Sequence, residues 1–153
     1  MTLRDAYEQA RKKYNLPSFN ELDREFEIAS IEVEENALRE IRHRIHDRIE
    51  FGAGILDTIC QPDPNSVRSM MECSFFGDTE KRKAYELSQK LAALWRSLTE
   101  AELLNDDKSD AEFIKHAFKE WQLFKEPLVT FVRKMRDSWK GTQTSKEELG
   151  YLG

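Results

Sequence analysis

Apolar side chains recur at helical spacing near the end of the sequence, and this pattern constrains the fold more than any other feature. With 100° between successive residues, they fall within roughly 80° of arc on one face of a helix. The members of this stripe are Phe113, Ala117, Trp121, Phe124, Leu128, Phe131, Met135 and Trp139. Because the phase continues across Pro127, we expect one long, kinked helix over about residues 110–140.

Two more long stripes of the same kind precede it. One covers about residues 30–60 and the other about residues 79–104. Ser18 with Glu21 predicts a capping box for a short helix, Ser30 is a candidate cap for the first long helix, and Ser109 with Glu112 predicts a capping box for the last. With short helices also expected near residues 2–14, 18–26 and 66–76, the sequence predicts an all-α fold, an elongated bundle of three long and three short helices.

The chain has the size and composition of a single helical domain. Its 153 residues include few glycines and prolines, and 35% of them are charged. We expect one domain over residues 1–140 and a C-terminal tail over residues 141–153. No uncharged run approaches the ~20 residues that span a bilayer, and Cys60 and Cys73 make no disulfide framework. These features predict a cytoplasmic protein that is not embedded in a membrane.

One helix face concentrates hydrogen-bond donors. Arg39, Arg42, His43 and His46 lie within about 100° on one side of the helix expected over residues 30–60. Such a strip suits phosphate or an acidic partner surface, although a solvated face explains it equally well. The net charge of −5 argues against general nucleic-acid binding, so contact with nucleic acid is expected only through this local strip.

The segment LREIRHRIHDRIE suggests a metal site, because Glu40, His43 and His46 are spaced three apart. The helix phase argues otherwise, since Glu40 and His43 project about 140° to 160° away from the centre of the apolar stripe. They are expected to face water. We therefore predict no metal ion and no cofactor.

Catalytic motifs are missing from the sequence. It contains no Gly-rich phosphate loop and no nucleophile elbow, which favours a protein that is not an enzyme. Glu34 and Glu102 nevertheless fall in phase with apolar stripes, and an inward carboxylate is suited to acid–base chemistry. Each lies near a helix end, where we expect it to reach solvent, and an enzyme using one of these carboxylates stays open as an alternative.

The last helix is apolar over an unusually wide arc. Ile114, Phe118, Val129 and Val132 extend its apolar face to about 160°, against about 100° for an ordinary surface helix. Either this helix is central, which we favour, or the extra strip is an interface with another chain, a second copy included. Phe118, Val129 and Val132 are therefore candidate interface residues. A second candidate lies in the tail, whose apolar residues resemble a short docking motif: they are Leu149, Tyr151 and Leu152.

Together these features predict a non-enzymatic helical interaction protein, an adaptor or assembly subunit that works through its helix surfaces. The first alternative is a subunit of a nucleoprotein complex whose Arg and His strip contacts phosphate. The second is an enzyme with an inward carboxylate. If the protein is an adaptor or assembly subunit, we expect its partner to be another protein.

Overall fold

The computed structural model describes residues 2–32 and 35–141. Within these residues it contains six α-helices, one short 3-10 helix and no strand. The elements are α1 (Leu3–Tyr14), α2 (Phe19–Phe26), η1 (Ile28–Ser30), α3 (Ala37–Cys60), α4 (Val67–Ser74), α5 (Asp78–Leu104) and α6 (Asp107–Gly141). The predicted all-α fold with three long helices is confirmed.

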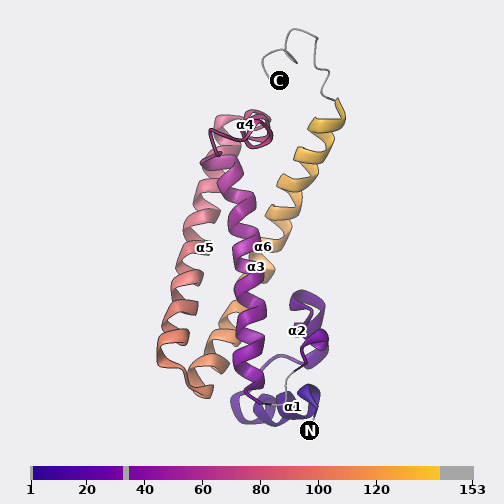
Figure 1. Cartoon of the computed structure of the whole chain (residues 1–153), viewed down its shortest axis with the longest axis vertical. Coiled ribbons are helices and arrows are strands. Elements are labelled where there is room, and N and C mark those ends of the chain that lie inside the picture. Colours follow the sequence, from indigo (N-terminus) through magenta and orange to yellow (C-terminus); the bar gives the residue numbers. More distant parts are fainter. Residues whose placement is uncertain (1, 33–34, 142–153) are drawn as a thin grey trace.

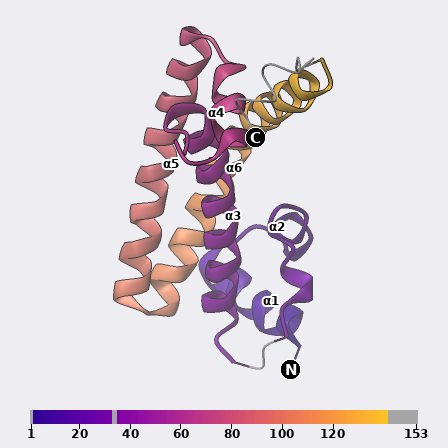
Figure 2. The same ribbon diagram turned by 45° about the horizontal axis from the view of Figure 1, so that its top comes forward.

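The three long helices α3, α5 and α6 run side by side along the molecule (Figure 1). Helix α3 contacts each of the other five α-helices and is the central element. Its isoleucines at positions 41, 45, 49 and 59 are almost completely buried. Helices α1 and α2 lie beside the N-terminal half of α3, and α4 lies at the opposite end of the bundle (Figures 1 and 2). Helix α6 contacts α3, α5 and α1, so it has neighbours on more than one side, as its wide apolar arc requires.

Two long helices begin at positions other than those predicted. Ser30 belongs to η1, and α3 begins only after Asn36, whose φ of 58° is left-handed. Asparagine tolerates this conformation better than most residues. Helix α6 begins after Asp106, whose Oδ1 accepts a hydrogen bond of 2.7 Å from the backbone N–H of Ser109. Asp106 therefore caps this helix, and the predicted capping by Ser109 is wrong.

Other local predictions are confirmed. The Ser18 hydroxyl accepts a hydrogen bond from the backbone N–H of Glu21, and the Glu21 carboxylate accepts one from the N–H of Ser18. Helix α6 continues without interruption through Pro127. Its apolar stripe therefore continues along one helix, buried from Phe113 to Met135 and ending at Trp139 beside Phe75.

A glycine allows α3 to approach α6 closely. A Cβ atom built on Gly52 would lie 3.3 Å from Cδ1 of Leu128 and 3.6 Å from Cη2 of Trp121. Contacts of 3.3 Å are tighter than those that most side chains make. The absence of a side chain at Gly52 thus allows α3 and α6 to lie close together beside Trp121 and Leu128.

Within the part of the chain that the structure describes, no helix combines the length and the apolarity needed to cross a membrane.

Candidate functional site

A groove of about 460 Å³ lies between α2, α3 and α6. Its side chains form two groups, an apolar floor and a basic rim. The floor consists of Phe51, Ile55, Trp121, Leu128, Val129 and Val132. The rim consists of Arg24, Arg48, Lys125, Arg133 and Arg136, with Glu25 as its one acidic residue.

Helical spacing brings the floor residues together. Phe51 and Ile55 are four residues apart and therefore lie on one face of α3. Val129 and Val132 are three residues apart on the facing side of α6. Phe51 is 65% exposed, Val129 38% and Val132 42%, so the apolar side chains at the groove edges are open to solvent.

Two of the rim cations are held by carboxylates of α2 and its C-terminal end. The ammonium of Lys125 lies 3.1 Å from Oε1 of Glu25, a carboxylate that is itself buried. Nη2 of Arg48 lies 3.1 Å from Oε1 of Glu27. These pairs tie α2 to α6 and α3 respectively, and they fix one end of the groove.

Of the other three cations in the rim, one has an ion-pair partner and two have none among the described residues. Arg136 forms an ion pair of 2.9 Å with its neighbour Asp137. Arg24 and Arg133 are exposed and form no ion pair with any residue that the structure describes. Two guanidinium groups at the groove are thus available to an external carboxylate or phosphate.

The predicted donor strip on α3 does not form as a single surface. Arg42 is 3% exposed and donates a hydrogen bond to Oδ1 of Asp110, so it cannot contact an external anion. Arg39 is exposed, and the side chain of His43 is 48% exposed, which confirms that His43 faces water. His46 is half-buried because its ring packs edge-on against Trp95, with the ring centroids 5.5 Å apart. Without Arg42 the strip loses one of its two guanidinium groups.

A small group of potential metal ligands lies on the same helix. The ligand atoms of His46, Asp47 and Glu50 all lie within 4.8 Å of one another, and both carboxylates are exposed. His43 instead lies 3.6 Å from a carboxylate oxygen of Glu40. A cation bound by His46, Asp47 and Glu50 would receive all of its protein ligands from one helix face. Water molecules would have to supply its remaining ligands.

The predicted interface residues occupy different places. Phe118 is half-buried and packs against the core, whereas Val129 and Val132 line the groove. Leu149, Tyr151 and Leu152 lie outside the described residues, and so does nearly all of the predicted tail. The wide apolar arc of α6 is therefore partly covered by the protein's own helices and partly open at the groove.

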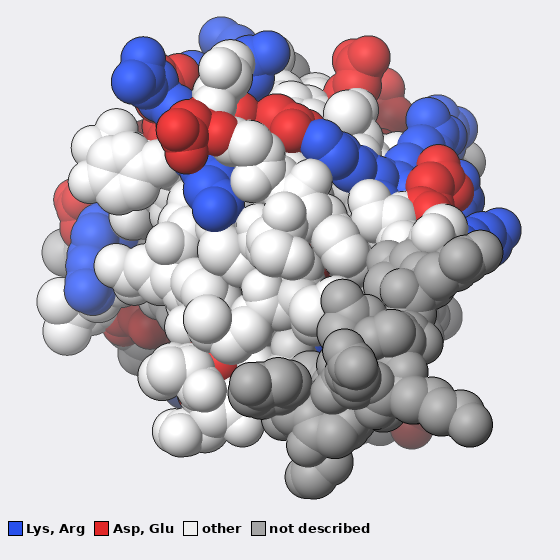
Figure 3. Space-filling model, turned by 90° about the horizontal axis from the view of Figure 1, so that it is seen from above, with Lys and Arg blue, Asp and Glu red and all other residues white. Residues whose placement is uncertain are grey.

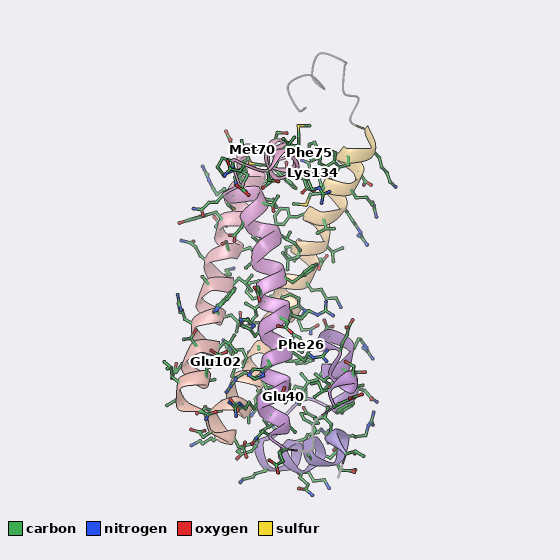
Figure 4. All side chains as sticks on the ribbon, viewed as in Figure 1. Phe26, Glu40, Met70, Phe75, Glu102 and Lys134 are labelled. Atoms are coloured by element: carbon green, nitrogen blue, oxygen red, sulfur yellow. The ribbon has the colours of Figure 1, made fainter. Side chains whose placement is uncertain are left out.

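One of the two carboxylates considered for catalysis lies on the surface. Glu102 is exposed on α5, close to the turn that leads to α6 (Figure 4). Glu102 therefore does not supply the inward carboxylate that the enzyme alternative requires. Glu34 lies outside the described residues.

Sequence reasoning missed the α3 and α2 walls of the groove. Phe51 lies about 120° from the centre of the apolar stripe of α3, and Ile55 about 80°. A large aromatic residue so far from the stripe is a signal for a second apolar surface on that helix. No sequence pattern places Arg24 beside it, because that contact depends on how α2 packs.

The end of the molecule formed by α4 is a second surface with few charges. Viewed from this end, uncharged side chains cover the centre, and charged ones lie around the upper and left edges (Figure 3). Val67 and Met70 are 48% and 47% exposed there. Phe75 packs edge-on against Trp139 with ring centroids 5.2 Å apart, which ties this end to α6 (Figure 4).

The chain matches no protein-family model, no curated protein and no solved structure. The chemistry of the groove follows from its own side chains. Its lining contains no hydroxyl, thiol or imidazole group, and its one carboxylate, Glu25, is paired with Lys125. Apolar surface flanked by guanidinium groups is suited to a ligand that has both apolar and anionic groups.

Proposed function

We propose that this protein is a non-enzymatic helical interaction protein, an adaptor or assembly subunit, that binds a segment of a partner protein in the α2–α3–α6 groove. One observation carries the proposal: Phe51, Val129 and Val132 stay exposed on facing edges of a single depression. Apolar side chains scattered over a surface need no explanation, but a contiguous apolar patch with a polar rim is typical of an interaction site.

The shape of the groove favours a helical segment. Its two long walls are the helices α3 and α6, and α2 bounds the third side. Proteins that bind amphipathic helices use such apolar grooves, into which side chains at positions i, i+3 or i+4, and i+7 of the partner insert. The floor residues contributed by α3 and α6 supply complementary apolar contacts along both walls.

We also propose that the protein is cytoplasmic. Cys60 and Cys73 are both free thiols, and each is half-buried. The thiol of Cys60 lies 3.8 Å from the carbonyl oxygen of Lys81, and that of Cys73 lies 3.3 Å from the carbonyl oxygen of Ile59. Half-buried cysteines that make backbone contacts, in a chain whose two cysteines form no disulfide framework, support this proposal.

A peptide library tests the binding function without knowledge of the natural partner. Random peptides displayed on phage are selected on the purified protein, and the binding site of the retained peptides is mapped by amide chemical shifts. We expect the shifts to cluster at the groove. Val132→Asp should weaken binding at least about tenfold, because it puts a charge where the apolar face of the peptide lies.

Leu123→Asp is the matched control. Leu123 is also an exposed apolar residue of α6, 66% exposed, but it lies outside the lining of the groove. Its variant should bind like the unchanged protein. The proposal fails if no peptide is retained, if the shifts map elsewhere, or if both variants behave alike. Self-association that Val132→Asp abolishes would also contradict it, since a second copy would then occupy the groove.

A further inference from the structure

The groove cations differ in whether the protein already neutralises them. Arg48, Lys125 and Arg136 lie within 3.1 Å of carboxylates of the same chain. Arg24 and Arg133 are exposed and have no carboxylate within 4.0 Å among the described residues, although their charges act on the more distant carboxylates of Glu21 and Asp137. Guanidinium groups form strong bidentate hydrogen bonds with carboxylates, so these two positions are suited to carboxylates of a ligand.

The two unpaired arginines are contributed by different walls of the groove. Arg24 lies on α2, and Arg133 lies on α6 directly after the floor residue Val132. The apolar floor includes Phe51, which is contributed by α3. A ligand that fills this floor and satisfies both arginines needs an apolar face with negative charges beside it. An amphipathic helix with acidic residues flanking its apolar stripe has this arrangement.

The charge of the whole chain makes the basic rim distinctive. The protein carries a net charge of −5, whereas the five basic residues of the rim and the three carboxylates that pair with them leave an excess of two positive charges at the groove. An acidic segment is repelled by the protein as a whole and attracted at this groove. Charge complementarity of this kind guides a partner to one location and disfavours binding elsewhere on the surface.

We infer that the occupant of the α2–α3–α6 groove is an acidic amphipathic helix whose carboxylates pair with Arg24 and Arg133. The inference rests on the proposed function and adds the chemistry of the partner to it. A small amphipathic anion fits less well, because a groove edged by Phe51 at 65% exposure does not enclose it. A flat membrane fits less well, because it cannot follow the depression to the apolar floor.

Two synthetic peptides test this inference. Both are about 20 residues long, are held helical by side-chain links, and carry the same apolar residues at i, i+3, i+4 and i+7. One carries Glu and the other Lys at the flanking positions. By fluorescence anisotropy, the Glu peptide should bind at least about tenfold more tightly, and its Kd should increase with salt because screening weakens exposed ion pairs.

Charge reversal on the protein provides the second measurement. The double variant Arg24→Glu with Arg133→Glu should bind the Glu peptide about tenfold more weakly and the Lys peptide more tightly than the unchanged protein does. Lys83→Glu with Lys90→Glu is the matched control, since it makes the same change of charge at exposed residues that line a different depression, between α5 and α6. Circular dichroism establishes that both variants are folded.

The outcomes separate this inference from the proposed function. Equal binding of the two peptides overturns the inference that the partner is acidic but leaves the proposal of groove binding intact. The acidic partner is also overturned if neither peptide binds while the library peptides still depend on Val132. Loss of binding in the control variant to the same degree overturns it too, because the effect would then be one of overall charge. Arginine-dependent sedimentation with phosphatidylserine vesicles, without discrimination between the peptides, would assign the groove to a membrane instead.

Discussion

Arg42 on α3 and Asp110 on α6 form an ion pair in which both side chains are almost completely buried, 3% and 4% exposed. The same guanidinium group donates a hydrogen bond of 3.3 Å to the carbonyl oxygen of Ala101, near the end of α5. Arg42 therefore connects all three long helices at one end of the bundle. A buried charge is tolerated only when its partner is present, so this contact specifies how the helices meet.

Removing Arg42 should destabilise the protein strongly. In Arg42→Met the Asp110 carboxylate stays buried without its cation, at a cost of about 3 to 5 kcal/mol in the free energy of unfolding. Urea unfolding measures this loss. The double variant Arg42→Met with Asp110→Leu should be more stable than Arg42→Met alone, because it leaves no unpaired charge.

Arg39→Met is the control for this substitution, since Arg39 is an exposed residue of the same helix. Its unfolding free energy should change by no more than about 0.5 kcal/mol. Equal losses for Arg39→Met and Arg42→Met would show that the buried pair does not contribute specifically.

The pH dependence of stability should carry a signature of Asp110. Burial raises its pKa above the ordinary value of 3.8, and the hydrogen bond from Arg42 opposes this rise. The folded protein therefore keeps this proton to a higher pH than the unfolded chain does. As pH rises from 3.8 through the raised pKa, the contribution of Asp110 to the unfolding free energy must decrease.

The measurement compares the unchanged protein with Asp110→Asn, which has no carboxyl group to titrate. Urea unfolding at a series of pH values on both sides of 3.8 gives the difference between their unfolding free energies. We expect the unfolding free energy of the unchanged protein to fall relative to that of Asp110→Asn as pH rises. A shift in favour of the unchanged protein would mean that Arg42 lowers the pKa of Asp110 more than burial raises it.

The inward position of Arg42 could have been predicted from the sequence. Arg42 precedes Ile49 by seven residues, which places the two side chains about 20° apart on a helix. Asp110 precedes the buried residues Phe113 and Ile114 by three and four positions, so it lies on the inward face of α6. Arg42 is the member of the donor strip that lies nearest the apolar stripe of α3, and Asp110 provides the buried partner for its charge.

The periodicity of apolar residues was sufficient to predict the three long helices, because burial of one stripe imposes helical spacing along its whole length. Helix ends were less predictable. The start of α3 depends on the left-handed backbone at Asn36, and several nearby residues are plausible caps by type alone. The sequence does not predict the groove itself: the width of the α6 stripe marks Val129 and Val132 as interface candidates, but the contribution of Arg24 requires the packing of α2.

Helix α4 should depend on Trp139 for its attachment. None of its residues is fully buried, and the indole N–H of Trp139 donates a hydrogen bond of 3.1 Å to the carboxylate of Glu72. The edge-on contact with Phe75 adds to this. In Trp139→Ala we expect the amide protons of α4 to exchange about fivefold faster, which corresponds to about 1 kcal/mol of lost local stability. Trp139→Phe, which keeps the ring, should show a smaller change, and unaltered exchange in both variants would disprove the attachment.

Two glycines of α3 should respond oppositely to substitution because their surroundings differ. A Cβ atom on Gly54 would meet nothing within 4 Å, whereas one on Gly52 would lie 3.3 Å from Leu128. Gly54→Ala should stabilise the protein by about 0.5 to 1 kcal/mol, since alanine favours the helix. Gly52→Leu should destabilise it by about 1 to 3 kcal/mol, because the larger side chain forces α3 and α6 apart. Thermal and urea unfolding measure both changes. If Gly54→Leu costs as much as Gly52→Leu, the close approach of the helices beneath the groove is not the cause.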